Sequence, residues 1–311
     1  MKRTYVSGHL GMVGSAIVRE LNKKKNNRTV ITATRNELDL TNQSDVNNFI
    51  KQVMPDEIIV AAAKVGGIHA NTTYPAEFIY DNLAIAINLI HSAYKNKIKK
   101  LLYLGSSCIY PREASQPINE KELLSGPLEK TNEWYAISKI AGIKLCQSFR
   151  KQYDCDFISA MPTNLYGIKD NYHLENAHVI PAIMHRAFLA KKNNEQKLTI
   201  WGTGNATREF LFVDDLAEGC IFLLNEYSEH SPINLGTGVE VSIKDLAVKI
   251  CEIVGFNGEL VFDTSKPDGT PRKVLDVTKI NELGWQSKTN LENGLKISFE
   301  WFLNNYNNIR K

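Results

Sequence analysis

The chain has 311 residues, of which 43% are hydrophobic and 23% are charged, a composition typical of a globular protein with a large core. Its net charge of +3 is spread along the sequence, and no apolar run approaches the roughly 20 residues of a membrane span. We therefore expect neither a nucleic-acid partner nor a membrane partner. The opening residues lead into a glycine-rich turn and show no leader peptide. Five cysteines without a CxxC pair favour free thiols in the cytoplasm and no metal site.

The first half of the chain alternates short β runs with helical patterns, as in a parallel sheet built from βαβ units. Strands are predicted at Thr4–Val6, Val30–Ala33, Glu57–Ala61, Lys100–Leu104 and Phe157–Ala160. Helices are predicted between them, at Val13–Leu21, Phe78–Tyr94 and Trp134–Gln152. The last three strands are short apolar runs, as expected for strands that are buried on both faces.

Beyond about Tyr166 the regular alternation ends, and longer loops appear at Gly167–Ala177 and Thr264–Lys273. Further strands are predicted at Leu198–Trp201, Glu209–Val213 and Ile233–Leu235, and helices near Ile180–Lys191, Asp215–Leu224 and Ile243–Val254. We predict an α/β fold in which residues 1–165 and about 209–238 form a Rossmann-type, doubly wound parallel sheet domain. Residues 166–208 and 239–311 would form a smaller, interleaved α/β domain that binds the substrate.

A GxxGxxG pattern follows the first predicted strand, with glycines at Gly8, Gly11 and Gly14. Glycines at this spacing allow a tight turn and let the backbone and the helix N-terminus approach a pyrophosphate. The position between a short strand and an apolar helix therefore indicates a dinucleotide-binding turn.

The residues after the second strand bear on the choice of cofactor. Enzymes that use NAD usually place Asp or Glu there, about 20 residues past the glycines, to bind the ribose 2′-hydroxyl. Here Arg35 holds that place, and a guanidinium suits a 2′-phosphate. Asp39 and Leu40 follow at a spacing suited to the adenine. The sequence therefore favours NADP(H).

Tyr135 and Lys139 form a YxxxK pair, and their spacing places both side chains on one helix face. An ammonium beside a phenol stabilises the phenolate, which predicts a lowered pKa for Tyr135. The lysine can also hold the nicotinamide ribose. Upstream, Ser106 and Ser107 follow a buried strand, where either hydroxyl could donate to a substrate carbonyl oxygen. Together these residues predict a hydride-transfer site.

Several longer motifs make a more specific comparison possible. They are AAAKVGGI at 61–68, GSSCIYP at 105–111, MPTNLYG at 161–167, NAHVIPA at 176–182, WGTG at 201–204, REFL at 208–211 and KPDGTPRK at 266–273. With these motifs the whole chain closely resembles the GDP-L-fucose synthase family. That family comprises bifunctional 3,5-epimerases and 4-reductases that act on GDP-4-keto-6-deoxy-D-mannose.

The resemblance implies roles for the matching residues. Ser106, Tyr135 and Lys139 would form the reductase triad, and Cys108 and His178 the acid/base pair for epimerisation. The motifs and the resemblance together predict cofactor contacts from Gly8, His9, Leu10, Gly11, Met12, Val13, Gly14, Arg35, Asp39, Leu40, Leu104, Gly105, Ser106, Ser107, Tyr135, Lys139, Pro162, Thr163, Asn164, Leu165 and His178. They predict contacts with a GDP-linked 4-keto-6-deoxy sugar from Asn164, Val179, Ile183, Arg186, Trp201, Arg208, Asp268 and Lys273.

These assignments agree with the chemistry that the reaction needs. A ketone at carbon 4 of a sugar acidifies the hydrogens on carbons 3 and 5, so inversion needs a base and an acid. A thiol and an imidazole both titrate near neutral pH, which suits Cys108 and His178. Arginine and lysine side chains suit a pyrophosphate, and Trp201 suits an apolar or sugar face.

One residue departs from the family pattern, and three further points stay open. The family often has arginine in the glycine turn, as GHRGMVG, whereas this chain has Leu10, which makes mixed cofactor use an alternative. A second reading keeps the fold but predicts a carbon-4 reductase with little or no epimerisation, acting on a GDP-4-keto-6-deoxy-heptose. A third is a non-catalytic protein that senses NADP. The resemblance also implies a homodimer formed through Phe78–Tyr94 and Trp134–Gln152.

Overall fold

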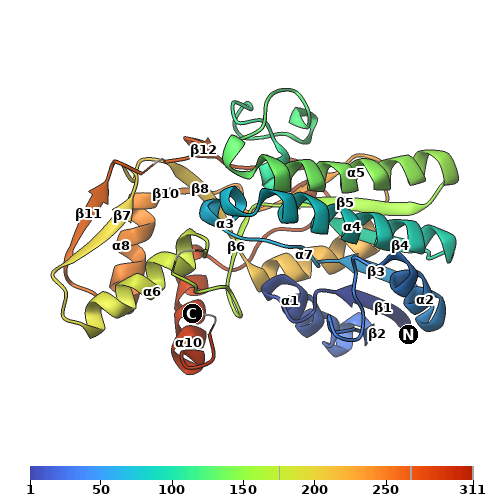
Figure 1. Ribbon diagram of the computed structural model, residues 1–311, viewed down its shortest axis with the longest axis horizontal. Helices are drawn as coiled ribbons and strands as arrows, with labels where there is room; N and C mark the ends of the chain where they lie inside the picture. The colour runs from blue at the N-terminus through green and yellow to red at the C-terminus, as the bar shows by residue number, and fades with distance from the viewer. Residues whose placement is uncertain (175, 267, 310–311) are drawn as a thin grey trace.

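The computed structural model describes residues 1–174, 176–266 and 268–309 (Figure 1). Six parallel strands form the central sheet, in the order β2-β1-β3-β4-β5-β9. Their bounds are β1 Lys2–Ser7, β2 Arg28–Ile31, β3 Glu57–Val60, β4 Lys100–Leu104, β5 Asp156–Pro162 and β9 Ile233–Leu235. Tyr5 of β1 lies beside Ile31 of β2 on one side and Ile58 of β3 on the other, which gives the register of these three strands.

Helices cover both faces of this sheet, so the predicted doubly wound α/β fold is confirmed. On one face α1 (Met12–Leu21) packs against α7 (Val213–Glu226), and their apolar side chains share a core with β1, β3 and β4. On the other face α2 (Gln43–Val53), α4 (Pro75–Lys95) and α5 (Glu133–Tyr153) close a second core. β3 reads EIIV and is buried throughout, because helices lie above and below it.

The sequence did not reveal α2, and its local chemistry explains why. Only Val46 and Ile50 of this helix are fully buried, so its apolar stripe is short. The helix instead begins at a capping residue: the Asn42 side chain accepts hydrogen bonds from the backbone N–H groups of Ser44 and Asp45.

A smaller region lies at the other end of the molecule (Figure 1). Its sheet is built from β6 (Asn164–Tyr166), β8 (Thr207–Phe212), β10 (Glu240–Ser242) and β12 (Arg272–Lys273), and β7 (Lys197–Trp201) pairs with β11 (Glu259–Asp263). The helices α6 (Val179–Lys192), α8 (Ile243–Val254) and α10 (Leu291–Asn305) share a third core with these strands. Shorter helices are α3 (Ile68–Thr73) and α9 (Thr278–Glu282), and 3-10 turns span Lys24–Asn26, Ser107–Ile109, Glu120–Glu122 and Lys130–Asn132.

The segment 209–238 is divided between the two sheets. Its helix α7 and strand β9 lie with the central sheet, whereas β8 pairs with β6, β10 and β12. The chain therefore crosses between the two regions more than once, and residues from both can meet at their junction.

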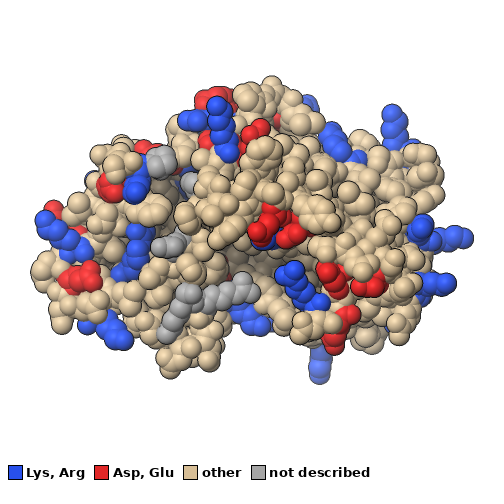
Figure 2. Space-filling model, in the orientation of Figure 1, with Lys and Arg blue, Asp and Glu red and all other residues tan. Residues whose placement is uncertain are grey.

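The charge distribution and the helix lengths bear on the expected partners. Figure 2 shows Lys and Arg mixed with Asp and Glu over the visible face, without a large patch of one sign. In the described part of the chain, no helix is long and apolar enough to cross a membrane.

The strand order reverses between β1 and β3, and this reversal positions the site. The chain leaves β1 at Gly8 and leaves β3 at Ala61, so the two loops start side by side at the carboxyl ends of the strands. A Cβ at Gly8 would lie 2.8 Å from the Ala62 Cα. Ligands of open α/β sheets bind in the crevice at such a point.

Candidate active site

The glycine turn has the geometry that the sequence predicts. Gly8 has φ +74, and the Gly11 N–H donates to the Gly8 carbonyl oxygen over 3.0 Å. A Cβ at Gly14 would lie only 2.2 Å from that oxygen, so the turn depends on the missing side chain. Helix α1 begins at Met12 with no side-chain cap, which leaves its first N–H groups free to bind an anion.

The loop after β2 carries both a cation and a carboxylate. Arg35 is exposed at the expected place, and Glu37 lies two residues further along the same loop. Glu37 accepts hydrogen bonds from the backbone N–H and the hydroxyl of Thr34, at 2.7 and 2.8 Å. These bonds lower the pKa of Glu37 and hold its carboxylate against its own loop. Arg35 thus places an exposed guanidinium in the loop after β2.

The two predicted adenine contacts follow in the same loop. Asp39 accepts hydrogen bonds from the backbone N–H and the hydroxyl of Thr41, which lower the pKa of Asp39. The carbonyl oxygen of Leu40 accepts a hydrogen bond from Asn88 on α4, over 2.9 Å. Asp39 is fixed by its own loop and Leu40 by α4, and neither lines the central cavity described below.

Ser106, Tyr135 and Lys139 meet where β4 ends and α5 begins. Nζ of Lys139 is buried, donates to the Leu104 carbonyl oxygen over 2.8 Å and lies 5.7 Å from the centre of the Tyr135 ring. Burial lowers the pKa of Lys139 to about 7. Burial also raises the pKa of Tyr135, and the charge of a Cys108 thiolate raises it further, while a hydrogen bond with Ser106 opposes them.

The predicted lowering of the Tyr135 pKa is therefore wrong for the protein on its own. Desolvation of the phenol is the largest cause of its raised pKa. Lys139 itself loses its proton near neutral pH, so no ammonium remains at the higher pH where the phenol would titrate. A raised pKa keeps Tyr135 protonated, which is the state that a proton donor requires.

Cys108 lies in the 3-10 turn that follows Ser106, and its sulfur is 3.4 Å from Nζ of Lys273. Burial acts to raise the pKa of the Cys108 thiol, but the charge of Lys273, hydrogen bonds with Ser106 and Lys273, and the charge of Arg208 act in the opposite direction and together outweigh it. The net pKa is below that of an ordinary thiol, so a larger fraction is thiolate at neutral pH.

His178 caps α6 and lies on the same cavity as Cys108. His178 is exposed to the cavity, yet the surrounding protein desolvates the imidazole and thereby lowers its pKa. The charge of Lys273 lowers that pKa further. Lys273 thus favours thiolate on one side and neutral imidazole on the other.

Cations and one indole lie at the outer end of the site. Arg186 lies 6.0 Å from the Trp201 ring, and Lys266 lies 5.5 Å from the same ring. Trp201 is 53% exposed, so its ring is free to pack on a ligand. Arg208 donates to the Asp268 carbonyl oxygen over 3.1 Å, and burial lowers its pKa.

A cavity of about 450 Å³ joins most of these groups. The predicted residues that line it are Met12, Val13, Leu104, Gly105, Ser106, Ser107, Cys108, Tyr135, Lys139, Pro162, Thr163, Asn164, Leu165, His178, Val179, Ile183, Arg186, Trp201, Arg208 and Lys273. The predicted residues that do not line it are Gly8, His9, Leu10, Gly11, Gly14, Arg35, Asp39, Leu40 and Asp268. Asp268 instead orders a loop, because its carboxylate accepts the backbone N–H and hydroxyl of Thr203. Pro267 of the motif 266–273 lies outside the described residues.

Sequence reasoning gave no role to two segments that line the cavity, within 61–71 and 129–132. The first contains Gly66 and Gly67, and this glycine pair is the signal that points to it. The Gly67 N–H donates to the Asn176 carbonyl oxygen over 3.0 Å, and a Cβ at Gly67 would lie 2.8 Å from the Ala177 oxygen. The two loops pack backbone to backbone, directly before His178.

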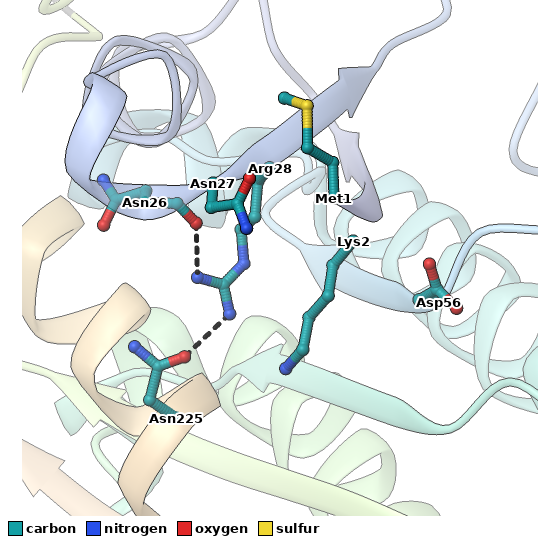
Figure 3. A pocket seen from close by; sticks show the side chains of 7 residues that line it. All are labelled: Met1, Lys2, Asn26, Asn27, Arg28, Asp56 and Asn225. Atoms are coloured by element: carbon teal, nitrogen blue, oxygen red, sulfur yellow. Dashed lines mark hydrogen bonds between the residues drawn. The ribbon is translucent and has the colours of Figure 1, made fainter.

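A second hollow, of about 550 Å³, lies at the opposite end of the central sheet (Figure 3). It is lined by Met1, Lys2, Asn26, Asn27, Arg28, Asp56 and Asn225. Its buried guanidinium is already paired, since Arg28 bonds to Glu57 and to Asn225. The hollow lies at the amino ends of β1 and β2, away from the ligand crevice of such sheets. We assign it no role.

Comparison with known proteins agrees with this architecture. The chain belongs to the NAD dependent epimerase/dehydratase family, which it matches over residues 4–236. GDP-L-fucose synthase 1 of Arabidopsis thaliana is 55% identical over 303 residues, covering 97% of this chain and 94% of that protein. The GDP-L-fucose synthase of Escherichia coli (strain K12) is 50% identical over 318 residues, covering 99% of each. Within the larger family, the chain therefore belongs to the GDP-L-fucose synthases.

A solved structure extends the comparison. A GDP-mannoheptose C4 reductase from Campylobacter jejuni, with NADP bound, superposes with a TM-score of 0.89 at 38% identity. The match covers 97% of this chain and 98% of that chain. The fold is therefore shared with a carbon-4 reductase of a longer sugar.

Proposed function

We propose that the protein reduces carbon 4 of GDP-4-keto-6-deoxy-D-mannose with NADPH after epimerising carbons 3 and 5. The observation that carries this proposal is one cavity that holds two sets of groups, Ser106, Tyr135 and Lys139 for reduction, and Cys108 and His178 for proton transfer. Membership of the GDP-L-fucose synthase family supports a GDP-linked sugar as the substrate.

The residues at the switch point fit NADPH. Gly8 and Gly14 leave room for a pyrophosphate at the start of α1, and Arg35 would hold the 2′-phosphate. Met12, Val13 and 162–165 would line the path to the nicotinamide. When bound, NADPH supplies the hydride that carbon 4 receives. The structure of a related reductase with NADP bound supports this choice of cofactor.

For epimerisation, Cys108 and His178 would work on opposite faces of the sugar. The Cys108 thiolate removes a proton from the carbon beside the ketone and becomes a thiol, and the imidazolium form of His178 returns a proton to the opposite face and becomes neutral imidazole. The C–H bond breaks, the electron pair passes to the ketone oxygen as an enolate, and a new C–H bond forms. The lowered pKa of Cys108 supports its role as the base.

For reduction, Tyr135 would donate its phenolic proton to the oxygen on carbon 4 while Ser106 hydrogen-bonds the same oxygen. Lys139 would hold the nicotinamide ribose. Arg186, Arg208 and Lys273 would bind the GDP pyrophosphate, and Trp201 would pack on the ligand.

The test follows two signals in one reaction with GDP-4-keto-6-deoxy-D-mannose. We expect oxidation of NADPH at 340 nm and, in D₂O, deuterium at both carbon 3 and carbon 5 of the product. Cys108→Ser should abolish the deuterium while Cys155→Ser, at another half-buried cysteine, should leave both signals unchanged. Wild-type protein that oxidises no NADPH with this substrate contradicts the proposal.

A carbon-4 reductase of a GDP-4-keto-6-deoxy-heptose is the second candidate, supported by the heptose reductase structure. Turnover of the heptose substrate without deuterium incorporation would favour it. The same assay should be run with NADPH and with NADH. This chain has Leu10 where the family often has arginine in the glycine turn, so its preference for NADPH needs to be measured.

We also propose that the protein is a homodimer joined through α4 and α5. These helices pack on each other and expose apolar side chains outward, among them Tyr80 and Ile87 on α4 and Trp134 on α5. Mass measurement in solution tests this, and Ile87→Glu should produce monomers. Free thiols at all five cysteines support the proposed cytoplasmic location, which cell fractionation tests.

We also propose that the chain divides into a cofactor-binding domain and a substrate-binding domain. Residues 1–165 with about 209–238 would bind the cofactor, and 166–208 with 239–311 would bind the GDP-sugar. We further propose that neither nucleic acid nor membrane is a partner, which binding assays with DNA, RNA and lipid vesicles test.

A further inference from the structure

Glu209 is a buried carboxylate between two functional segments. The residue is fully buried on β8, directly after Arg208. One carboxylate oxygen, Oε1, accepts the backbone N–H groups of Thr237 and Gly238. The other, Oε2, accepts the backbone N–H of Leu275 over 2.7 Å. A single side chain therefore joins the turn after β9 to the segment that contains β12.

That segment positions Lys273. β12 is only two residues long and pairs with β8 so that Lys273 lies beside Arg208. Arg272 before it forms a two-pronged ion pair with Glu240 on β10, at 2.7 to 3.0 Å. Two residues after Lys273, Leu275 donates to Glu209. The lysine backbone is thus held on both sides by carboxylates.

The position of Lys273 matters because Nζ lies 3.4 Å from the Cys108 sulfur. The attraction between an ammonium and a thiolate falls with distance, so a small shift of β12 weakens it. The other groups that interact with Cys108 are Ser106 after β4, Tyr135 on α5 and Arg208 on β8. The charge of Lys273 also lowers the pKa of His178.

We propose that Glu209 is a positioning residue for epimerisation, whose carboxylate fixes the Lys273 ammonium beside Cys108 and thereby sets the thiolate fraction of that cysteine. The inference rests on the proposed role of Cys108 as a base. Glu209 is the second residue of the REFL motif at 208–211 and does not line the cavity. The proposal gives this residue a function.

The test measures alkylation of Cys108 by iodoacetamide as a function of pH, in the full-length protein without substrate. Peptide mass spectrometry reads each cysteine separately, so half-buried Cys155 serves as an internal reference. Lys273→Met should raise the pH midpoint of Cys108 alkylation by about 1 unit or more, because an opposite charge is lost. Glu209→Gln and Glu209→Asp should raise it in the same direction.

The sign separates positioning from a direct charge effect. Loss of the negative charge in Glu209→Gln would by itself favour the thiolate and lower the midpoint, whereas displacement of Lys273 raises it. Glu209→Asp keeps the charge and shortens the reach, so it should also raise the midpoint. Glu57→Gln, at a carboxylate of similar burial beside Arg28, controls for general destabilisation and should leave the midpoint unchanged.

A Cys108 midpoint that stays at the wild-type value in Glu209→Asp and Glu209→Gln, while Lys273→Met shifts it, overturns the proposal. If neither Glu209 variant folds, Gly236→Ala decides, because its Cβ would lie 2.1 Å from Glu209 Oε1 and push the carboxylate aside. In the reaction, Glu209→Asp should reduce deuterium incorporation more than it changes the KM for NADPH. Failure of the proposed function is distinguishable, since it appears as wild-type protein that oxidises no NADPH.

Discussion

Lys139 on α5 donates a hydrogen bond from Nζ to the main-chain oxygen of Leu104, the last residue of β4, over 2.8 Å. This bond ties the helix that carries Tyr135 to the strand end that leads into Ser106. Because Lys139 is 4% exposed, the amine bonds to a carbonyl in place of water, and burial lowers its pKa to about 7. The reductase residues therefore form one rigid unit, and the energetic consequence is measurable.

Lys139→Met should remove a pH-dependent part of the stability. In the folded protein Lys139 loses its proton above about pH 7, whereas in the unfolded chain it keeps the proton up to about 10.5. Between these values the unfolded state binds more protons, so wild-type stability rises with pH. The difference in unfolding free energy, wild type minus variant, should increase from pH 7 to 10 and stay flat below pH 7. Urea unfolding of the cofactor-free proteins measures it.

The control for this experiment is Lys144→Met, which is exposed on the same helix. Groups that titrate in both proteins cancel in the difference, so only Lys139 contributes. Parallel curves for wild type and Lys139→Met across this range would contradict the assignment of a lowered pKa.

Tyr135→Phe should separate the two halves of the reaction. The raised pKa keeps the phenol of Tyr135 protonated, as its proposed role of proton donor requires, and phenylalanine keeps the ring while removing the proton. We expect NADPH oxidation to fall by about 10²- to 10⁴-fold. Deuterium incorporation at carbons 3 and 5 of the substrate should persist, because Cys108 and His178 are intact.

Tyr103→Phe is the matched control for this variant. Its ring is buried and lies 5.0 Å from Nζ of Lys139, but Tyr103 does not line the cavity. This control should keep the wild-type reductase rate. A Tyr135→Phe variant with full reductase activity would contradict the proposed role of Tyr135 as proton donor.

Much of this architecture could be predicted from the sequence, because the signals are local. The buried strands read as apolar runs, and Gly8 and Gly14 after β1 stand where a side chain would clash with neighbouring backbone. The YxxxK pair lies in the first turns of α5, as its spacing indicates. Each of these features is decided by neighbours along the chain.

Features that depend on distant partners were missed or misjudged. The pKa of Tyr135 follows its burial, which the sequence does not reveal, and not its lysine neighbour alone. β12 exists because its two residues pair with β8 across a long loop, and Lys273 meets Cys108 only through that pairing.

Arg35 and Leu10 should control the preference for NADPH over NADH. Charge-assisted hydrogen bonds contribute about 1.5 to 3 kcal/mol, so Arg35→Ala should raise the KM for NADPH by about 10- to 100-fold. The KM for NADH, which has no 2′-phosphate, should change little. Leu10 is 62% exposed, so Leu10→Arg disturbs no core and should lower the KM for NADPH about tenfold. Equal changes for both cofactors would contradict this account.

Gly67→Ala should impair epimerisation through a backbone contact. The Gly67 N–H donates to the Asn176 oxygen, and an added Cβ would lie 2.8 Å from the Ala177 oxygen, so the two loops must separate. His178 follows directly and should move with its loop. A displacement near 1 Å costs about a hundredfold in such a site, so deuterium incorporation should fall by about 10- to 100-fold.

The cofactor should remain bound in Gly67→Ala, because the glycine turn after β1 is untouched. NADPH affinity, measured by fluorescence titration, should therefore stay within about twofold of wild type. Gly126→Ala is the control, since the nearest atom to its added Cβ is 3.4 Å away on the Pro111 side chain. If Gly67→Ala incorporated deuterium at the rate of Gly126→Ala, the packing of these two loops would not be what holds His178 in place.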